Sequence, residues 1–105
     1  MSIPQKYLAA AQDANRRLEA GDAKGAIQAA MPVVQALPNY PEIHVVLGRS
    51  FRLLGETEKS LARFRSAAEL APKDAARWGE FIDALLKDGQ KGRARKVAQK
   101  APLKG

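Results

Sequence analysis

The side chains that could take part in catalysis are few and scattered in this chain. His44 is its single histidine, and the absence of cysteine excludes a thiol nucleophile, a thiolate metal site and a disulfide. Histidine is the commonest general base, but no serine and aspartate accompany His44 in a catalytic motif. No group of His, Asp and Glu has the spacing of a metal site. We therefore expect no catalytic residue, no metal, no cofactor and no enzyme activity.

Two further sets of residues give weaker chemical signals. Glu80 and Asp83 lie three residues apart, as a carboxylate pair on one helix face would, but solvation or pairing with basic neighbours is the simpler interpretation. Gln90, Lys91 and Gly92 follow one another but lack the spacing of a phosphate-binding loop. We interpret them as a turn between helices.

Two arginines indicate binding rather than catalysis. Arg49 and Arg52 lie three residues apart and share one face of a helix, and Val45 and Val46 give that face an apolar floor one turn earlier. A guanidinium group matches a carboxylate or a phosphate through two parallel hydrogen bonds. The pattern therefore predicts an extended or helical ligand segment with an acidic side chain and an apolar anchor.

Composition places the chain among soluble globular proteins. It has 105 residues, of which 46% are hydrophobic and 28% charged. No apolar run approaches the roughly 20 residues that cross a bilayer. Asp13, Arg16, Arg17 and Glu19 interrupt the layout that a signal peptide would need in residues 1–20. We expect one domain over residues 1–105, located in the cytoplasm, with no membrane span.

The positive charge is concentrated near the end of the sequence. The net charge is +7, and residues 87–105 hold seven basic residues and one acidic residue. A basic face can attract an acidic partner, nucleic acid or an anionic membrane, although a solvated helix face is the simplest interpretation. The segment has no aromatic residue for base stacking and no recognition motif, so nucleic-acid binding is not expected.

The strongest pattern in the sequence is a repeat of 34 residues. Gly21, Gly55 and Gly89 recur at this interval, and so do Pro38 and Pro72. Apolar residues stand at helical spacing on both sides of each glycine. Glycine suits the left-handed conformation that ends a helix, and proline cannot continue one. The repeat therefore predicts helical hairpins and no strand.

The predicted helices form pairs around these glycines. Their ranges are 5–20 and 23–37, then 42–54 and 57–70, then 75–88 and 91–101. The first helix is degenerate because alanine, aspartate and arginine hold the aligned places of large side chains, as a terminal repeat allows. We expect Trp78 to be buried between the second and third hairpins. The last helix should cap the stack, with one face formed by Ala94, Val97, Ala98 and Ala101.

These residues give the chain a resemblance to tetratricopeptide repeat proteins. The family pattern of Trp, Leu-Gly, aromatic, small, aromatic, Ala and Pro reads here as His44, Leu47-Gly48, Phe51, Ser60, Phe64, Ala67 and Pro72. The third repeat has Trp78 in the Trp place and departs from the pattern elsewhere. The resemblance covers about residues 7–101. It implies an all-α fold, an α-α superhelix or right-handed solenoid of three hairpins, with repeats at about 7–40, 41–74 and 75–105.

The resemblance also implies where a ligand would bind. In this family the first helices of successive repeats line a concave groove that commonly holds an extended peptide or a partner helix. By alignment the groove residues are Gln12, Asn15, Val45, Val46, Arg49, Arg52, Glu80 and Asp83. Asp83 is aligned with Arg49, and Glu80 lies one turn away, so pairing of Arg49 inside the protein is the alternative to ligand binding.

One known use of the groove does not fit this sequence. Some family members hold the carboxylate at the end of a chaperone with a clamp of lysines, asparagines and an arginine. The aligned places here hold Ala11, Asn15, Val46, Ala76 and Glu80, of which only Asn15 matches. The expected function is therefore an adaptor or scaffold that binds another protein or peptide partner. The alternative is an accessory or oligomerisation module of a larger protein, such as a transferase.

Overall fold

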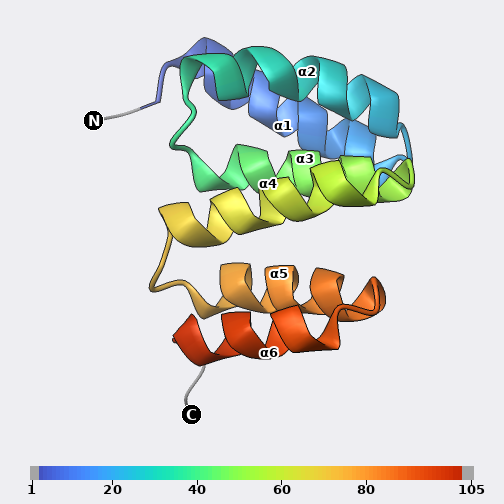
Figure 1. Cartoon of the computed structure of the whole chain (residues 1–105). Helices are drawn as coiled ribbons and strands as arrows, with labels where there is room; N and C mark the ends of the chain where they lie inside the picture. The colour runs from blue at the N-terminus through green and yellow to red at the C-terminus, as the bar shows by residue number, and fades with distance from the viewer. Residues whose placement is uncertain (1–2, 103–105) are drawn as a thin grey trace.

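The fold consists of six helices, seen here in a computed structural model that describes residues 3–102 (Figure 1). They are α1 (Gln5–Glu19), α2 (Ala23–Ala36), α3 (Pro41–Leu53), α4 (Thr57–Leu70), α5 (Ala75–Lys87) and α6 (Lys91–Lys100). Within residues 3–102 there is no strand. The all-α prediction is confirmed, and every helix begins and ends within one residue of its predicted range.

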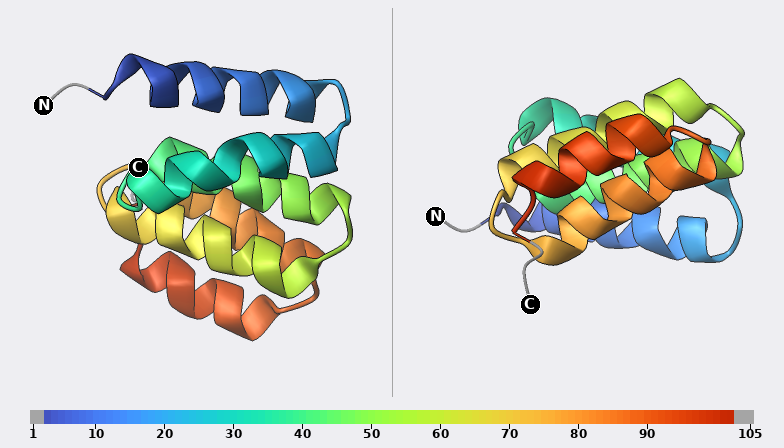
Figure 2. Two further views of the ribbon diagram at one scale, coloured as in Figure 1. Left: turned by 90° about the horizontal axis from the view of Figure 1, so that it is seen from above. Right: turned by 60° about the horizontal axis from the view of Figure 1, so that its bottom comes forward.

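The helices pair into hairpins that stack along one axis. The hairpins α1–α2, α3–α4 and α5–α6 follow one another from the top to the bottom of Figure 1. Seen from above, α1 and α6 lie at opposite edges of the molecule, so the hairpins are staggered, as in a solenoid (Figure 2). Helix α2 packs against α3, and α4 packs against α5, which joins each hairpin to the next.

The repeating glycines end the first helix of each hairpin. Gly21, Gly55 and Gly89 have φ angles of 84°, 74° and 77°, the left-handed region that side chains with a Cβ avoid. In each turn the residue after the glycine donates its N–H to a carbonyl five residues earlier, as Gln90 does to Leu85 at 2.9 Å. This hydrogen bond satisfies a carbonyl that the end of a helix leaves free. The 34-residue spacing of glycine is therefore the spacing of these turns.

A second repeated interaction fastens the loop between hairpins. The Nε1–H of Trp78 donates to the carbonyl of Pro72 at 2.8 Å, and Nε2 of His44 lies 2.7 Å from the carbonyl of Pro38. A carbonyl only accepts, so Nε2 of His44 carries the proton. Both rings are buried. The equivalent place in the first hairpin holds Ala10, which cannot form this bond.

The core consists of two clusters that lie between the hairpins. One joins the second and third hairpins around Phe64, Trp78, Phe81 and Leu85. The other joins the first and second hairpins and is built mainly from aliphatic side chains. Its fully buried members are Ala14, Ala30, Val33, Ile43 and Leu47, all with 0% exposure. Trp78 is 9% exposed and contacts α4 residues in its cluster, so its predicted burial between the hairpins is confirmed.

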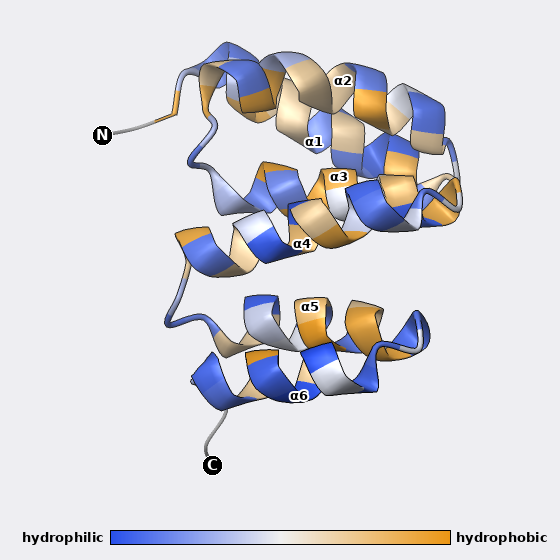
Figure 3. Cartoon of the chain, viewed as in Figure 1, coloured by the Kyte–Doolittle hydropathy of each residue, from blue (hydrophilic) through white to orange (hydrophobic). Residues whose placement is uncertain are grey.

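The prediction for the last helix is right except at one residue. Ala94 and Ala101 are buried and Val97 is half-buried, but Ala98 is exposed. Ala98 stands 34 residues after Phe64, which is buried against the first helix of the following hairpin. No helix within residues 3–102 packs on α6 in that way. The remaining face of α6 is strongly polar, as expected (Figure 3).

Replacing Trp78 tests the ring-to-carbonyl interaction. Trp78→Ala should lower the free energy of unfolding by about 3–5 kcal/mol, because a large buried ring is lost. Trp78→His should cost less, since histidine retains a ring N–H for the carbonyl of Pro72, as His44 does for Pro38. Urea unfolding followed by circular dichroism measures both. Equal losses for the two variants would show that the hydrogen bond does not contribute.

Two glycine-to-alanine substitutions should change stability in opposite directions. A Cβ on Gly48 would lie 3.0 Å from Cε1 of Phe64, whose ring is buried with little room to move. Gly48→Ala should therefore cost about 1–3 kcal/mol. A Cβ on Gly79 would meet nothing within 4 Å. Gly79→Ala should add about 0.5–1 kcal/mol through helix propensity. Thermal unfolding of the two variants checks both signs.

Candidate interaction groove

A cavity of about 450 Å³ lies between the first helices of the first two hairpins. We call it the α1–α3 groove. Its lining residues are Leu8, Ala11, Gln12, Asn15, Arg16, Tyr40, Glu42, Ile43, Val45, Val46, Arg49 and Arg77. They come from α1, from α3 and the residue before it, and from the first turns of α5. The groove is therefore built mainly on helices rather than on loops.

The floor of the groove is apolar and comes from α3. Ile43, Val45 and Val46 are 0%, 5% and 8% exposed. Residues 43–48 are all buried, because α3 contacts α1, α2 and α4 and so has almost no free face. A helix that is buried on most sides needs apolar residues around most of its circumference. The two valines predicted as groove residues therefore line the groove and also pack in the core beneath the groove.

Two ion pairs join α3 to α5 beside the groove, and each helix supplies the arginine of one pair and the glutamate of the other. Nε of Arg49 on α3 lies 2.6 Å from Oε2 of Glu80 on α5, and Nη2 of Arg77 on α5 lies 3.5 Å from Oε1 of Glu42 on α3. The Arg49 side chain is 44% exposed, and the Glu80 side chain is 17% exposed. Arg49 is therefore paired inside the protein, and a partner's carboxylate would have to compete with Glu80.

Arg77 is the lining residue whose charge is most enclosed. Its side chain is 20% exposed, and its Nε is buried without a hydrogen-bond partner among residues 3–102. That Nε lies 3.9 Å from Oδ2 of Asp74. A buried donor without a partner costs free energy. The charge of Arg77 is therefore incompletely compensated at this edge of the groove.

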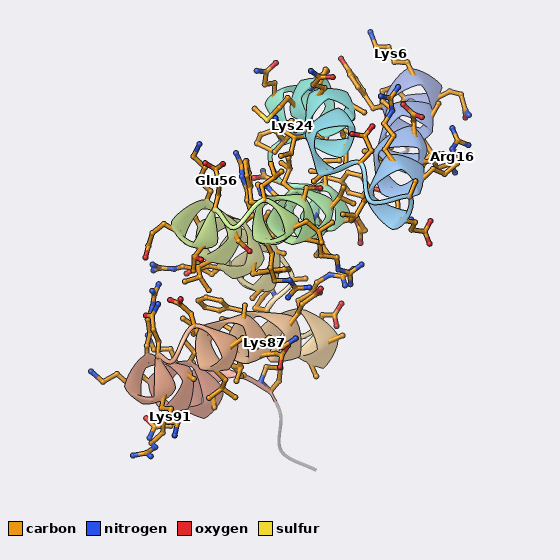
Figure 4. The ribbon with its side chains drawn as sticks, turned by 90° about the vertical axis from the view of Figure 1, so that its right-hand side faces the viewer. Lys6, Arg16, Lys24, Glu56, Lys87 and Lys91 are labelled. Carbon is orange, nitrogen blue, oxygen red and sulfur yellow. The ribbon has the colours of Figure 1, made fainter. Side chains whose placement is uncertain are left out.

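The remaining polar side chains form the rim. Arg16 pairs with Asp13 at 3.5 Å but stays 72% exposed, and its side chain extends away from α1 (Figure 4). Asn15 donates to Glu19 at 3.4 Å. Burial, and secondarily the charge of Glu42, raise the pKa of Tyr40 above its ordinary value of 10.0. Tyr40 is therefore a neutral hydroxyl at physiological pH, able to donate or accept a hydrogen bond.

The structure brings together five of the eight residues predicted for the groove and places three elsewhere. Those together are Gln12, Asn15, Val45, Val46 and Arg49. Arg52 lies 5.2 Å from the ring centroid of Phe64 and lines a separate cavity near the end of α5. Glu80 is bound to Arg49, and Asp83 pairs with Lys87 on its own helix at 3.2 Å. Arg49 and Arg52 therefore line two different cavities, although they are three residues apart on one helix.

Sequence reasoning missed seven of the groove residues, of which the polar ones are Arg77, Glu42, Tyr40 and Arg16. Arg77 left a detectable signal, because it stands 34 residues after Ile43, a fully buried aliphatic residue. A charge in an apolar repeat position is expected to have a specific partner. The other three occupy ordinary surface or helix-start positions, and their repeat positions carry no comparable signal.

The described part of the chain holds neither a cluster of metal-ligand side chains nor a helix that could span a membrane. Between residues 3 and 102, no three His, Cys, Asp or Glu side chains come together as metal ligands would. No helix of that region has the length and apolar character that crossing a membrane requires.

Comparison with known proteins identifies the fold. The structure is similar to MamA residues 41–end from Desulfovibrio magneticus RS-1 and to a MamA RS-1 ArsTM double mutant, each with a TM-score of 0.83 and 18% sequence identity. Each match covers 92% of this chain and 55% of the MamA chain, so this chain spans about half the length of those structures. No family model and no curated protein matches the sequence. The fold is a tetratricopeptide-type helical solenoid.

The Arg49–Glu80 pair should contribute little to stability despite its short distance. Because the Arg49 side chain is 44% exposed, a double-mutant cycle with Arg49→Ala and Glu80→Ala should give a coupling free energy of about 0–1 kcal/mol. The coupling should decrease as salt is added. Chemical denaturation of the four proteins at two salt concentrations measures it. A large coupling that is independent of salt would show that the pair holds α3 against α5.

Proposed function

We propose that this solenoid is a protein-interaction module that holds a segment of a partner protein in the α1–α3 groove, as an adaptor or scaffold in the cytoplasm. The observation that carries the proposal is the groove itself, an open cavity of about 450 Å³ with a buried valine floor and an arginine-rich edge. Cavities of about 300–1,000 Å³ with a few placed polar groups are typical of binding sites.

The groove favours a segment with one apolar side chain and one acidic side chain. The apolar side chain would lie on Val45 and Val46, since both are already packed from below. Three arginines line the groove, and each lies within 4 Å of a carboxylate of the protein, so an acidic ligand group would share these guanidinium groups with the protein's own carboxylates. Arg77 supports this most directly, because its guanidinium makes only long contacts with Glu42 and Asp74, at 3.5 Å and 3.9 Å, among residues 3–102. The acidic group is thus assigned to Arg77 together with Arg49.

A second candidate function is an accessory or oligomerisation module of a larger protein. Leu53 and Leu54 are 60% and 39% exposed, and both line a surface hollow with Gly21 and Lys24 at the turns of the first two hairpins. Exposed neighbouring leucines are typical of a surface that another domain or subunit covers. A contact abolished by Leu53→Ser but unaffected by filling the α1–α3 groove would favour this second function.

Filling the groove tests the main proposal. Gln12 lines the groove and is exposed, so Gln12→Trp should occupy part of the cavity without disturbing the core. A partner captured from native lysate by the parent chain should bind this variant at least about tenfold more weakly, the loss of about 1.4 kcal/mol.

The matched control is Gln28→Trp, the same substitution at an exposed position of α2. It should bind the partner as the parent does. Isothermal titration with the captured partner measures both variants. Equal affinity of Gln12→Trp and the parent would exclude the α1–α3 groove as the binding site.

A further inference from the structure

A second groove lies on the other side of the stack, between the second helices of the last two hairpins. Helices α4 and α6 do not contact each other, and a cavity of about 220 Å³ lies between them over α5. Its rim includes Arg65 of α4 and Arg93, Lys96 and Lys100 of α6, and its floor includes Phe81. We call it the α4–α6 groove. It shares no residue with the α1–α3 groove.

The basic side chains of α6 form a stripe that makes no salt bridge with any of residues 3–102. Arg93, Lys96 and Lys100 follow at spacings of three and four residues, which places them along one face of the helix. None of the salt bridges found in residues 3–102 involves a residue of α6. On the opposite rim, Arg65 is paired with Glu69 at 3.2 Å. The α6 side of the groove therefore carries uncompensated positive charge.

The preceding hairpins supply an internal comparison, because residues 34 positions earlier occupy the equivalent places between α2 and α4. There Ala62 stands in the place of Lys96, and Ser66 stands in the place of Lys100. Lys59, which corresponds to Arg93, is paired with Glu56 at 3.4 Å. The fold therefore forms without cations at these places, so the stripe is a property of this groove rather than a requirement of the repeat.

The floor limits the kind of anion that fits. Phe81 is 2% exposed and Val97 is half-buried beside it, so the floor is apolar but offers no free aromatic face. The guanidinium of Arg93 already lies 5.9 Å from the centroid of the Phe81 ring. Single-stranded nucleic acid binds such sites by stacking bases on aromatic rings, which this floor does not present. A protein segment can instead supply an aliphatic side chain to the floor and carboxylates to the rim.

We propose that the α4–α6 groove binds an acidic amphipathic helix of a partner protein. Carboxylates spaced at three and four residues on that helix would face Arg93, Lys96 and Lys100, and aliphatic side chains between them would lie on Val97, the partly exposed part of the floor. The helix would lie along α6 as a helix lies in a groove. This binding is independent of the partner segment proposed for the α1–α3 groove, so the chain would connect two acidic segments on opposite sides.

The test uses a synthetic helix-forming peptide with glutamates at positions i, i+3 and i+7 and leucines between them. The double variant Lys96→Ala, Lys100→Ser replaces both lysines with the residues that the preceding hairpin has at the same places. It should bind the labelled peptide roughly three- to tenfold more weakly than the parent in an anisotropy titration at low salt. A peptide with glutamine in place of glutamate should lose affinity for the parent to a similar extent.

Two controls separate this groove from total charge and from the proposed function. Lys91→Thr removes a charge from α6 outside the groove, again giving the residue of the preceding hairpin, and should leave affinity for the peptide within about twofold. Lys91 lies at the end of the stack opposite to Lys6 (Figure 4). Gln12→Trp, which fills the α1–α3 groove, should also bind the peptide as the parent does.

Three results would overturn the inference. One is equal peptide affinity of the double lysine variant and the parent. Another is loss of the peptide on Gln12→Trp, which would place it in the α1–α3 groove. The third is tighter binding of the parent to an oligonucleotide or to anionic vesicles than to the peptide, with the same dependence on Lys96 and Lys100. Circular dichroism of each variant confirms that it is folded.

Discussion

The stack depends on how each loop between hairpins is held against the next first helix. A ring N–H of Trp78 or His44 donates to a proline carbonyl six residues earlier, at 2.8 Å and 2.7 Å. The same ring is buried between hairpins, so one side chain both holds the loop by a hydrogen bond and packs in the core. This fixes the position of α3 and of α5. The grooves on both sides of the stack are defined by the positions of those two helices.

The sequence was sufficient for the fold because its signals are local and periodic. A glycine with positive φ and a proline act on the backbone within a few residues, so their 34-residue interval locates the turns without knowledge of the packing. The groove residues were only partly predictable, since their partners come from other helices. Arg52 is drawn to the ring of Phe64, and the contact between Arg77 and Glu42 spans 35 residues. Neither contact follows from spacing along one helix.

The two grooves show how a repeat can keep its framework while its surfaces diverge. Framework positions keep their roles in the last two hairpins, as the pair His44 and Trp78 shows. Surface positions change chemistry between hairpins, as Ala62 and Lys96 do. The two sides of the molecule also differ in whether their basic side chains form salt bridges. Those of the α1–α3 groove are paired with carboxylates of α1, α3 and α5, whereas the basic stripe of α6 makes no salt bridge within residues 3–102.

The alanine at position 10 has a consequence for how the molecule moves. Helix α1 lacks the ring-to-carbonyl bond, and Ala14 is its one fully buried residue within the described chain. In a linear stack each unit is stabilised only by its neighbours, so the least anchored end opens first. Helix α1 is also one wall of the α1–α3 groove. The width of that groove therefore depends on a terminal helix of the stack, whose local opening would let the groove adjust to segments of different thickness.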